Sequence, residues 1–198
     1  MNAAKSVATV LYAAETAPPQ PLSVEERVDA MFDAHYDAIW RTVKRLGVPD
    51  ADADDAAQRV FVVAARRLDT ILHGHEGRYL YGIAVRVASE MRRRAPSRRI
   101  AGGDELLAAI PDDAVGPEEA LLESEARDAL DAALDGMPDD LRTVLVLVEI
   151  EGMSIVDLAE ILEVPVGTAT SRLRRAREEF SASARRVRAR LGIHGGAK

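Results

Sequence analysis

The sequence predicts an all-α protein with two small helical domains joined by a flexible linker, the second domain containing a helix-turn-helix. Apolar residues recur at spacings of three and four, and strictly alternating β-branched runs are missing. A stretch rich in Gly, Pro and acidic residues, 95–118, separates two groups of such segments. The 198 residues suffice for two small cores. We therefore expect a mobile tail over 1–23, domains over 24–94 and 119–191, and a short tail over 192–198.

Charge is sorted along the chain, although the net charge of -7 is acidic. Residues 84–99 carry six Arg and one Glu, and residues 164–191 carry eight Arg and two Glu. Between them, residues 100–163 carry two Arg against eighteen Asp and Glu. Local basic patches, rather than the net charge, set the attraction to phosphate, so each basic segment is a candidate nucleic-acid contact. The alternative is that both runs are solvated helix faces.

Several classes of protein find no support in the composition. Cysteine is absent, which excludes disulfides and Cys-ligated zinc and is consistent with a reducing cytoplasm. No apolar run, 144–148 included, is long enough to cross a bilayer, and no signal peptide is apparent, so we expect a cytoplasmic protein without membrane insertion. No phosphate-cradling glycine loop is present, and the four His lack a nucleophile partner. The sequence predicts neither an enzyme nor a cofactor.

The first helix should begin at Ser23, because Glu26 three residues later completes a capping box. Its predicted core stripe is Val28, Phe32, Tyr36, Ile39, Val43 and Leu46.

The next helix is predicted over 52–69, with Phe61 facing the core and Asp54, Asp55 and Gln58 sharing the exposed side. Carboxylates at a helix start are either caps or a binding site, and the spacing alone favours caps.

A loop with His73 and His75 follows, and two His without a further ligand predict solvated residues rather than a metal site. The helix predicted over 78–94 turns aromatic and basic side chains outward. They are Tyr79, Arg86, Glu90, Arg93 and Arg94. Rings stack on unpaired bases and arginines follow the backbone, so this helix suits single-stranded DNA. A core tyrosine beside a solvated basic end is the alternative.

In the second domain, helices over 118–135 and 138–150 should carry a helix-turn-helix over 154–177. Ser154 caps its first helix, and Pro165 suits the first turn of the second. The second helix should turn its hydroxyls and arginines outward, where its N-terminal end can enter a major groove. These candidates are Thr168, Thr170, Ser171, Arg172 and Arg175. An ordinary surface hairpin with a basic face is the alternative.

The segment 137–177 resembles region 4, the promoter-binding C-terminal domain of bacterial sigma factors of the extracytoplasmic-function group. The resemblance rests on Met137-Pro138, Glu151-Gly152-Met153-Ser154 and Val164-Pro165-Val166-Gly167-Thr168. It implies that the five candidates on the second helix read minus-thirty-five DNA. Ala169 and Thr170 depart from the pattern, where Val and a basic residue are more usual.

Two N-terminal segments are similar to the same family. ADDAAQRVF resembles its core-polymerase-binding segment, which implies that Asp54, Asp55 and Gln58 meet the clamp of the largest polymerase subunit. The segment from Arg78 resembles the promoter-melting helix, which implies minus-ten DNA contacts by the five outward residues named above. That pattern reads Trp-Leu-Tyr-Arg-Ile-Ala-Arg-Asn, and this chain departs from it at Gly82, Val85, Arg86 and Glu90.

The resemblance implies a transcription initiation factor whose partners are core RNA polymerase, including the flap of the second-largest subunit, promoter DNA and an anti-sigma factor. The alternative is a stand-alone helix-turn-helix regulator whose N-terminal domain is a sensor or dimerisation module. It would bind specific DNA tightly without polymerase, whereas an initiation factor would bind little or none.

Overall fold

The computed structural model describes residues 23–72, 74–94 and 117–191, with only the backbone described for 117–123 and 191. All regular elements in these ranges are helical, which confirms the predicted all-α class. The predicted N-terminal tail up to residue 22, His73, the linker up to residue 116 and the tail from residue 192 lie outside the described residues. The division into domains therefore stays a prediction.

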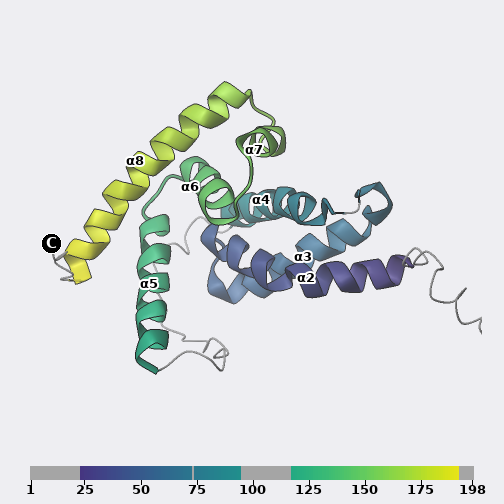
Figure 1. The fold of residues 1–198 in the computed structure, drawn as a ribbon, viewed down its shortest axis with the longest axis horizontal. Helices are drawn as coiled ribbons and strands as arrows, with labels where there is room; N and C mark the ends of the chain where they lie inside the picture. The colour runs from purple at the N-terminus through teal and green to yellow at the C-terminus, as the bar shows by residue number, and fades with distance from the viewer. Residues whose placement is uncertain (1–22, 73, 95–116, 192–198) are drawn as a thin grey trace, which may run out of the picture.

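The N-terminal lobe consists of α2 (Val24–Arg45), α3 (Asp50–Ala65), a short 3-10 turn η1 (Leu68–Thr70) and α4 (Glu76–Arg94). Each of α2, α3 and α4 packs against the other two (Figure 1). The predicted capping box is confirmed, because Ser23 Oγ accepts from the Glu26 amide at 3.2 Å and the Glu26 carboxylate accepts from the Ser23 amide at 2.8 Å. Bonds to Ser23 lower the pKa of the Glu26 carboxyl, the larger part coming from the backbone bond.

The predicted core stripe of α2 is confirmed except at Phe32. Ile39, Val43 and Leu46 are buried, and Val28 and Tyr36 are partly buried against the same core, whereas Phe32 is 40% exposed. Its ring lies at the edge of the α2–α3 layer and stacks on Tyr36, with centroids 4.6 Å apart. The helical period gave the correct direction, but within the described residues no further helix covers this end of α2 and α3.

The C-terminal lobe consists of α5 (Pro117–Asp135), α6 (Asp139–Leu145), a π-helical turn η3 (Val146–Ile150), α7 (Ile155–Ile161) and α8 (Val166–Leu191). Figure 1 shows α8 as one long helix that runs past α6 to α5, and it packs against both. Ser183 of α8 is buried beside Gly136, where an added Cβ would lie 2.4 Å from the Ser183 hydroxyl. This close approach explains a glycine between α5 and α6.

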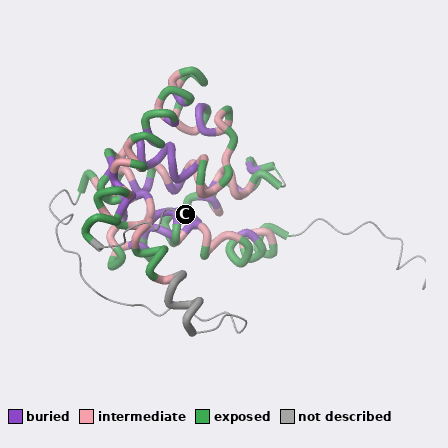
Figure 2. The backbone as a smooth tube through the Cα atoms, turned by 60° about the vertical axis from the view of Figure 1, so that its left-hand side comes forward, coloured by how far each residue is buried: buried purple, intermediate pink, exposed green. Residues whose placement is uncertain are grey.

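The two lobes are packed against each other. Leu134, Met137 and Leu141 belong to the same buried apolar cluster as Ile39 and Val43 of α2. A second cluster, inside the helix-turn-helix, is touched by side chains of α4. Buried positions accordingly run through the middle of the molecule in Figure 2, and exposed positions lie around them.

Candidate nucleic-acid and polymerase interface

The three predicted polymerase-contact residues of α3 are all exposed, but their surroundings differ. The Asp54 carboxylate accepts hydrogen bonds from the Trp40 indole N–H at 2.9 Å and from the Tyr36 hydroxyl at 3.2 Å. Asp55 pairs with Arg59 one turn later at 2.9 Å. Asp54 therefore fixes α3 against α2, while Asp55 and Gln58 present the outer face.

An aromatic cluster supports this face from α2. Phe61 is buried as predicted, and its ring centroid lies 5.0 Å from that of Phe32. Burial, together with the charge of Asp54, raises the pKa of the Tyr36 hydroxyl, so that this group stays protonated as a donor. Beside Gln58 on the outer face, Val62 is 51% exposed. The exposure of Phe32 and Val62 was not predicted. The helical period shows on which face of a helix a side chain lies, but it does not show whether another helix covers that face.

The predicted minus-ten residues lie on α4, and the structure gathers only three of the five. Tyr79, Arg86 and Glu90 line one groove of about 750 Å³. Ile71, Leu72, Ile83 and Val87 add apolar lining, and Arg67, His75 and Arg78 add polar and cationic groups. Apolar lining beside cations suits a base and its phosphate. Tyr79 is half-buried rather than turned fully outward, because its ring packs against the first apolar cluster.

The remaining two minus-ten candidates are placed differently. Arg93 lines a separate cavity of about 370 Å³ on the other side of α4. Arg94 pairs with Glu90 at 2.6 Å, so one candidate partly neutralises another. The charged side chains at the C-terminal end of α4 therefore lie on two sides of the helix, with Arg93 at the smaller cavity and Arg94 paired with Glu90 of the groove.

The helix-turn-helix predicted from the sequence is present. Ser154 Oγ accepts from the Asp157 amide at 3.1 Å and begins α7. The turn after α7 passes through Glu163 at φ 55°, a left-handed conformation, and α8 then starts at Val166. Pro165 lies just before α8 rather than in its first turn, and its carbonyl accepts from the Ala169 amide at 3.1 Å. Ala169, Leu173 and Ala176 are buried, as predicted.

At the start of α8, Thr170, Ser171 and Arg175 are exposed and Thr168 is half-buried. Two hydroxyls are engaged within the helix, since Thr170 donates to the Val166 carbonyl and Ser171 to the Thr168 carbonyl, each at 2.9 Å. Both can rotate to another acceptor at little cost. Within the described residues no ion pair holds Arg175.

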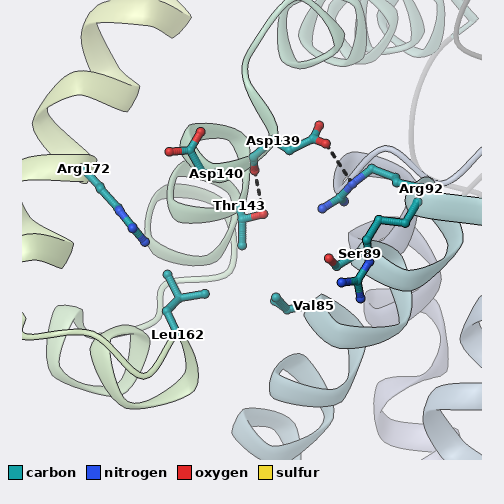
Figure 3. Close-up of a pocket in the computed structure, with 9 residues that line it drawn as sticks. Val85, Ser89, Arg92, Asp139, Asp140, Thr143, Leu162 and Arg172 are labelled. Atoms are coloured by element: carbon teal, nitrogen blue, oxygen red, sulfur yellow. Dashed lines mark hydrogen bonds and ion pairs between the residues drawn. The ribbon is translucent and has the colours of Figure 1, made fainter. Parts of the chain in front are cut away.

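Arg172 is not turned outward as predicted. It is half-buried and lines the cavity of about 370 Å³ that Arg93 reaches from α4. Figure 3 shows Arg172 pointing from α8 towards Asp140 and Leu162, with Arg92 on the opposite wall. Arg92 pairs there with Asp139 at 3.3 Å. Arg172 is half-buried because α8 packs onto α6 at this position. The helical period of the sequence cannot reveal which helix α8 packs against.

Glu151, between η3 and α7, lies at the contact between the lobes and was not a predicted site residue. Its carboxylate accepts from the Tyr81 hydroxyl of α4 at 2.8 Å, and its other oxygen lies 2.8 Å from Thr42 Oγ1 and 3.6 Å from Arg45 of α2. Burial and the bond to Glu151 raise the pKa of the Tyr81 hydroxyl. No periodic signal marks a single carboxylate in a loop, so only the fold reveals this contact.

The described residues hold no group of three or more His, Asp or Glu side chains suited to a metal ion. None of the described helices is both long and apolar enough to span a membrane. What the described structure offers is a helix-turn-helix with exposed hydroxyls and arginine, an apolar and cationic groove on α4, and an acidic face on α3. These features define a helical DNA-binding protein.

Comparison with known proteins narrows this class. The family described as Sigma-70, region 4 matches residues 127–180. The chain is 36% identical over 141 residues to the ECF RNA polymerase sigma-E factor of Escherichia coli (strain K12), covering 66% of this chain and 73% of that relative. It is 30% identical over 152 residues to the ECF RNA polymerase sigma factor SigE of Mycolicibacterium smegmatis, covering 77% of this chain and 59% of that relative's length.

One solved structure shares the fold across most of the chain. The sigma factor RpoE of Bartonella quintana, solved in complex with the anti-sigma factor NepR, aligns with a TM-score of 0.59 at 19% identity. The alignment covers 79% of this chain and 96% of that one. Given the identity and coverage of the curated relatives, the chain belongs to the extracytoplasmic-function RNA polymerase sigma factors of the sigma-70 family.

Proposed function

We propose that this sigma factor binds core RNA polymerase through the outer face of α3, holds melted minus-ten DNA in the groove of α4, and reads duplex minus-thirty-five DNA with the start of α8. One observation carries the proposal. Each of the two DNA-facing helices exposes arginine beside groups suited to its form of DNA, rings and apolar side chains on α4 and hydroxyls on α8. Phosphate contacts would position the protein, and a few side chains would specify bases.

In this proposal the chain carries out no covalent chemistry, because binding free energy alone drives strand separation. We place the protein in the cytoplasm, where polymerase and chromosome meet. The RpoE structure contains the anti-sigma factor NepR, and a solved structure of CnrH contains the cytosolic domain of CnrY. These complexes support an anti-sigma partner for this chain too.

Run-off transcription on genomic fragments tests the proposal as a whole. Core polymerase supplemented with the full chain should produce discrete promoter-dependent transcripts that core enzyme alone does not produce. Absence of any such transcript with a folded protein would exclude the proposal. Tight sequence-specific DNA binding without polymerase would instead favour the stand-alone regulator.

Arg175→Ala tests the assignment of α8. It should weaken promoter use by about ten-fold, the size expected for one good base contact, and leave association with core polymerase unchanged. Arg174→Ala is the matched control, because Arg174 lies on the same helix but is paired with Glu178 at 2.7 Å. Equal loss of promoter use and of polymerase association in Arg175→Ala would show that α8 is misassigned.

Asp55→Arg tests the polymerase face. A reversed charge at an exposed centre of this face should reduce co-purification with core enzyme by repulsion from a basic partner. Asp128→Arg on α5 makes the same charge change at an exposed position elsewhere. If both variants co-purify like the unmodified protein, α3 is not the docking face.

A further inference from the structure

The first turn of α8 carries an apolar side chain that the structure leaves uncovered. Val166 is the first residue of this helix and is 45% exposed. We propose that Val166 contacts the 5-methyl group of a thymine in the major groove of the minus-thirty-five element and thereby contributes to the choice of promoter. The inference rests on the proposed role of α8 and adds the class of base that the leading end of this helix selects.

The leading end of α8 lacks the side chains that read the other bases. In the major groove, Arg and Lys pair with guanine, Asn and Gln with adenine, and Asp and Glu with cytosine. Residues 164–171 contain none of these six residue types. What they offer besides glycine, alanine and proline is two hydroxyl-bearing threonines, one serine and two valines. An apolar contact with the thymine methyl group is therefore the specific base contact that this end can make.

The arginines further along α8 do not supply the missing donors at its leading end. Arg172 points towards Asp140 and the cavity in Figure 3. Arg174 is paired with Glu178 at 2.7 Å. Arg175 lies roughly 13 Å from Val166 along the helix axis, so it reaches a different base pair. Val166 thus acts on a part of the element that no arginine of this helix reads.

Gly167 leaves the surface beside Val166 open. Apart from its chain neighbours and the backbone of its own helix, no atom of the described residues lies within 4 Å of an added Cβ. Gly167 is also not among the glycines with positive φ. Neither crowding nor backbone conformation therefore requires glycine here. Glycine allows a backbone to come close to a ligand, so a base pair can approach α8 near enough to contact Val166.

Thr170 extends the apolar surface by one helical turn. It lies four residues after Val166, on the same face of α8, and is exposed. Its hydroxyl donates to the Val166 carbonyl at 2.9 Å. While that bond holds, the methyl group of Thr170 is the part of the side chain left for a contact outside the helix. A threonine methyl group also contacts the thymine methyl group in the major groove, so the two side chains favour the same base.

Deoxyuridine tests the contact, because it pairs with adenine as thymidine does but lacks the 5-methyl group. Holoenzyme made from core polymerase and the full chain is bound to a promoter fragment found by run-off transcription. Each thymine of the minus-thirty-five element, on either strand, is then replaced by uracil in turn. At one position the replacement should weaken binding in a competition assay by about four-fold, as expected for burial of one methyl-sized group. Val166→Ser should abolish this preference for thymine, whereas Val166→Ile should retain it.

Val156→Ser is the matched control, because Val156 is 51% exposed but lies on α7, which is not the helix proposed to enter the groove. It should keep the full preference for thymine. Promoter binding that no uracil replacement weakens, or a weakening that persists unchanged in Val166→Ser, would overturn the role of Val166 and leave the proposed function standing. Absence of promoter-dependent binding by the unmodified holoenzyme would instead overturn the proposed function, and the inference with it.

Discussion

The Tyr81 hydroxyl donates a 2.8 Å hydrogen bond to the Glu151 carboxylate, and this bond joins α4 of the first lobe to the loop that precedes the helix-turn-helix. Thr42 Oγ1 lies equally close to Glu151, but its single proton is shared with the Ala38 carbonyl at 2.8 Å. The Tyr81 hydroxyl therefore donates its proton to Glu151 alone, whereas the Thr42 hydroxyl does not. The bond is half-buried and its acceptor is charged, which makes it stronger than an ordinary neutral bond.

Tyr81→Phe should lower the free energy of unfolding by about 1–2 kcal/mol, because the Glu151 carboxylate loses a donor without regaining water. Urea denaturation followed by circular dichroism measures the change. Tyr79→Phe is the control on the same helix, since the described residues give the Tyr79 hydroxyl no hydrogen bond, and it should change stability by less than about 0.5 kcal/mol. Equal effects of the two substitutions would contradict the role of Glu151.

The same pair predicts a stability loss at alkaline pH. Burial and the bond to Glu151 raise the pKa of the Tyr81 hydroxyl above its ordinary value of 10.0, so the folded state keeps the proton to higher pH than the unfolded chain does. This contribution is fully present below about pH 10 and is lost as pH rises towards the folded-state pKa. The stability difference between the unmodified protein and Tyr81→Phe should narrow from pH 9 to pH 11. A difference that stays constant would contradict the prediction.

Asp54→Ala should loosen α3 from α2, because the carboxylate holds both Trp40 and Tyr36. We expect a loss of about 1–2 kcal/mol in unfolding free energy. Trp40 is the single tryptophan of the chain, so its emission spectrum reports the change directly. Asp55→Ala removes the neighbouring carboxylate, whose pair with Arg59 is exposed and is worth at most about 0.5 kcal/mol. An emission change in Asp55→Ala but not in Asp54→Ala would refute this assignment.

Gly47→Ala should be strongly destabilising for two reasons. Gly47 has a φ of 89°, and an added Cβ would lie 2.3 Å from Nη1 of the buried Arg142. That guanidinium cannot move aside freely, because it donates to the Asp135 carbonyl at 3.1 Å. We expect a loss of about 2–4 kcal/mol, which combines backbone strain with overpacking.

Gly74→Ala separates these two causes. Gly74 has a similar φ of 82°, but apart from its chain neighbours no atom of the described residues lies within 4 Å of an added Cβ. Its substitution should cost only the strain, about 1–2 kcal/mol. Thermal unfolding of both variants measures the difference. Equal losses of stability would show that the Arg142 side chain can move away from the added Cβ without destabilising the protein.

Local chemistry made much of the fold predictable. The capping box at Ser23 and the helix start at Ser154 follow from side chains three residues apart, and the inward face of α8 follows from the helical period. The candidate residues of α3 and most of those of α8 are exposed for the same reason. Arg172 and Tyr79 escaped prediction, because their burial depends on which second helix covers them.

The sequence by itself determined the helices, their caps, the helix-turn-helix and the sorting of charge, since these depend on neighbours within about one helical turn. The tertiary structure alone decided that Asp54 fixes α3 to α2, that Glu151 meets Tyr81, and that Glu163 faces Arg86. These pairs join residues far apart in the chain, and each partner is an ordinary polar side chain with no periodic signal. Only packing between helices brings them within bonding distance.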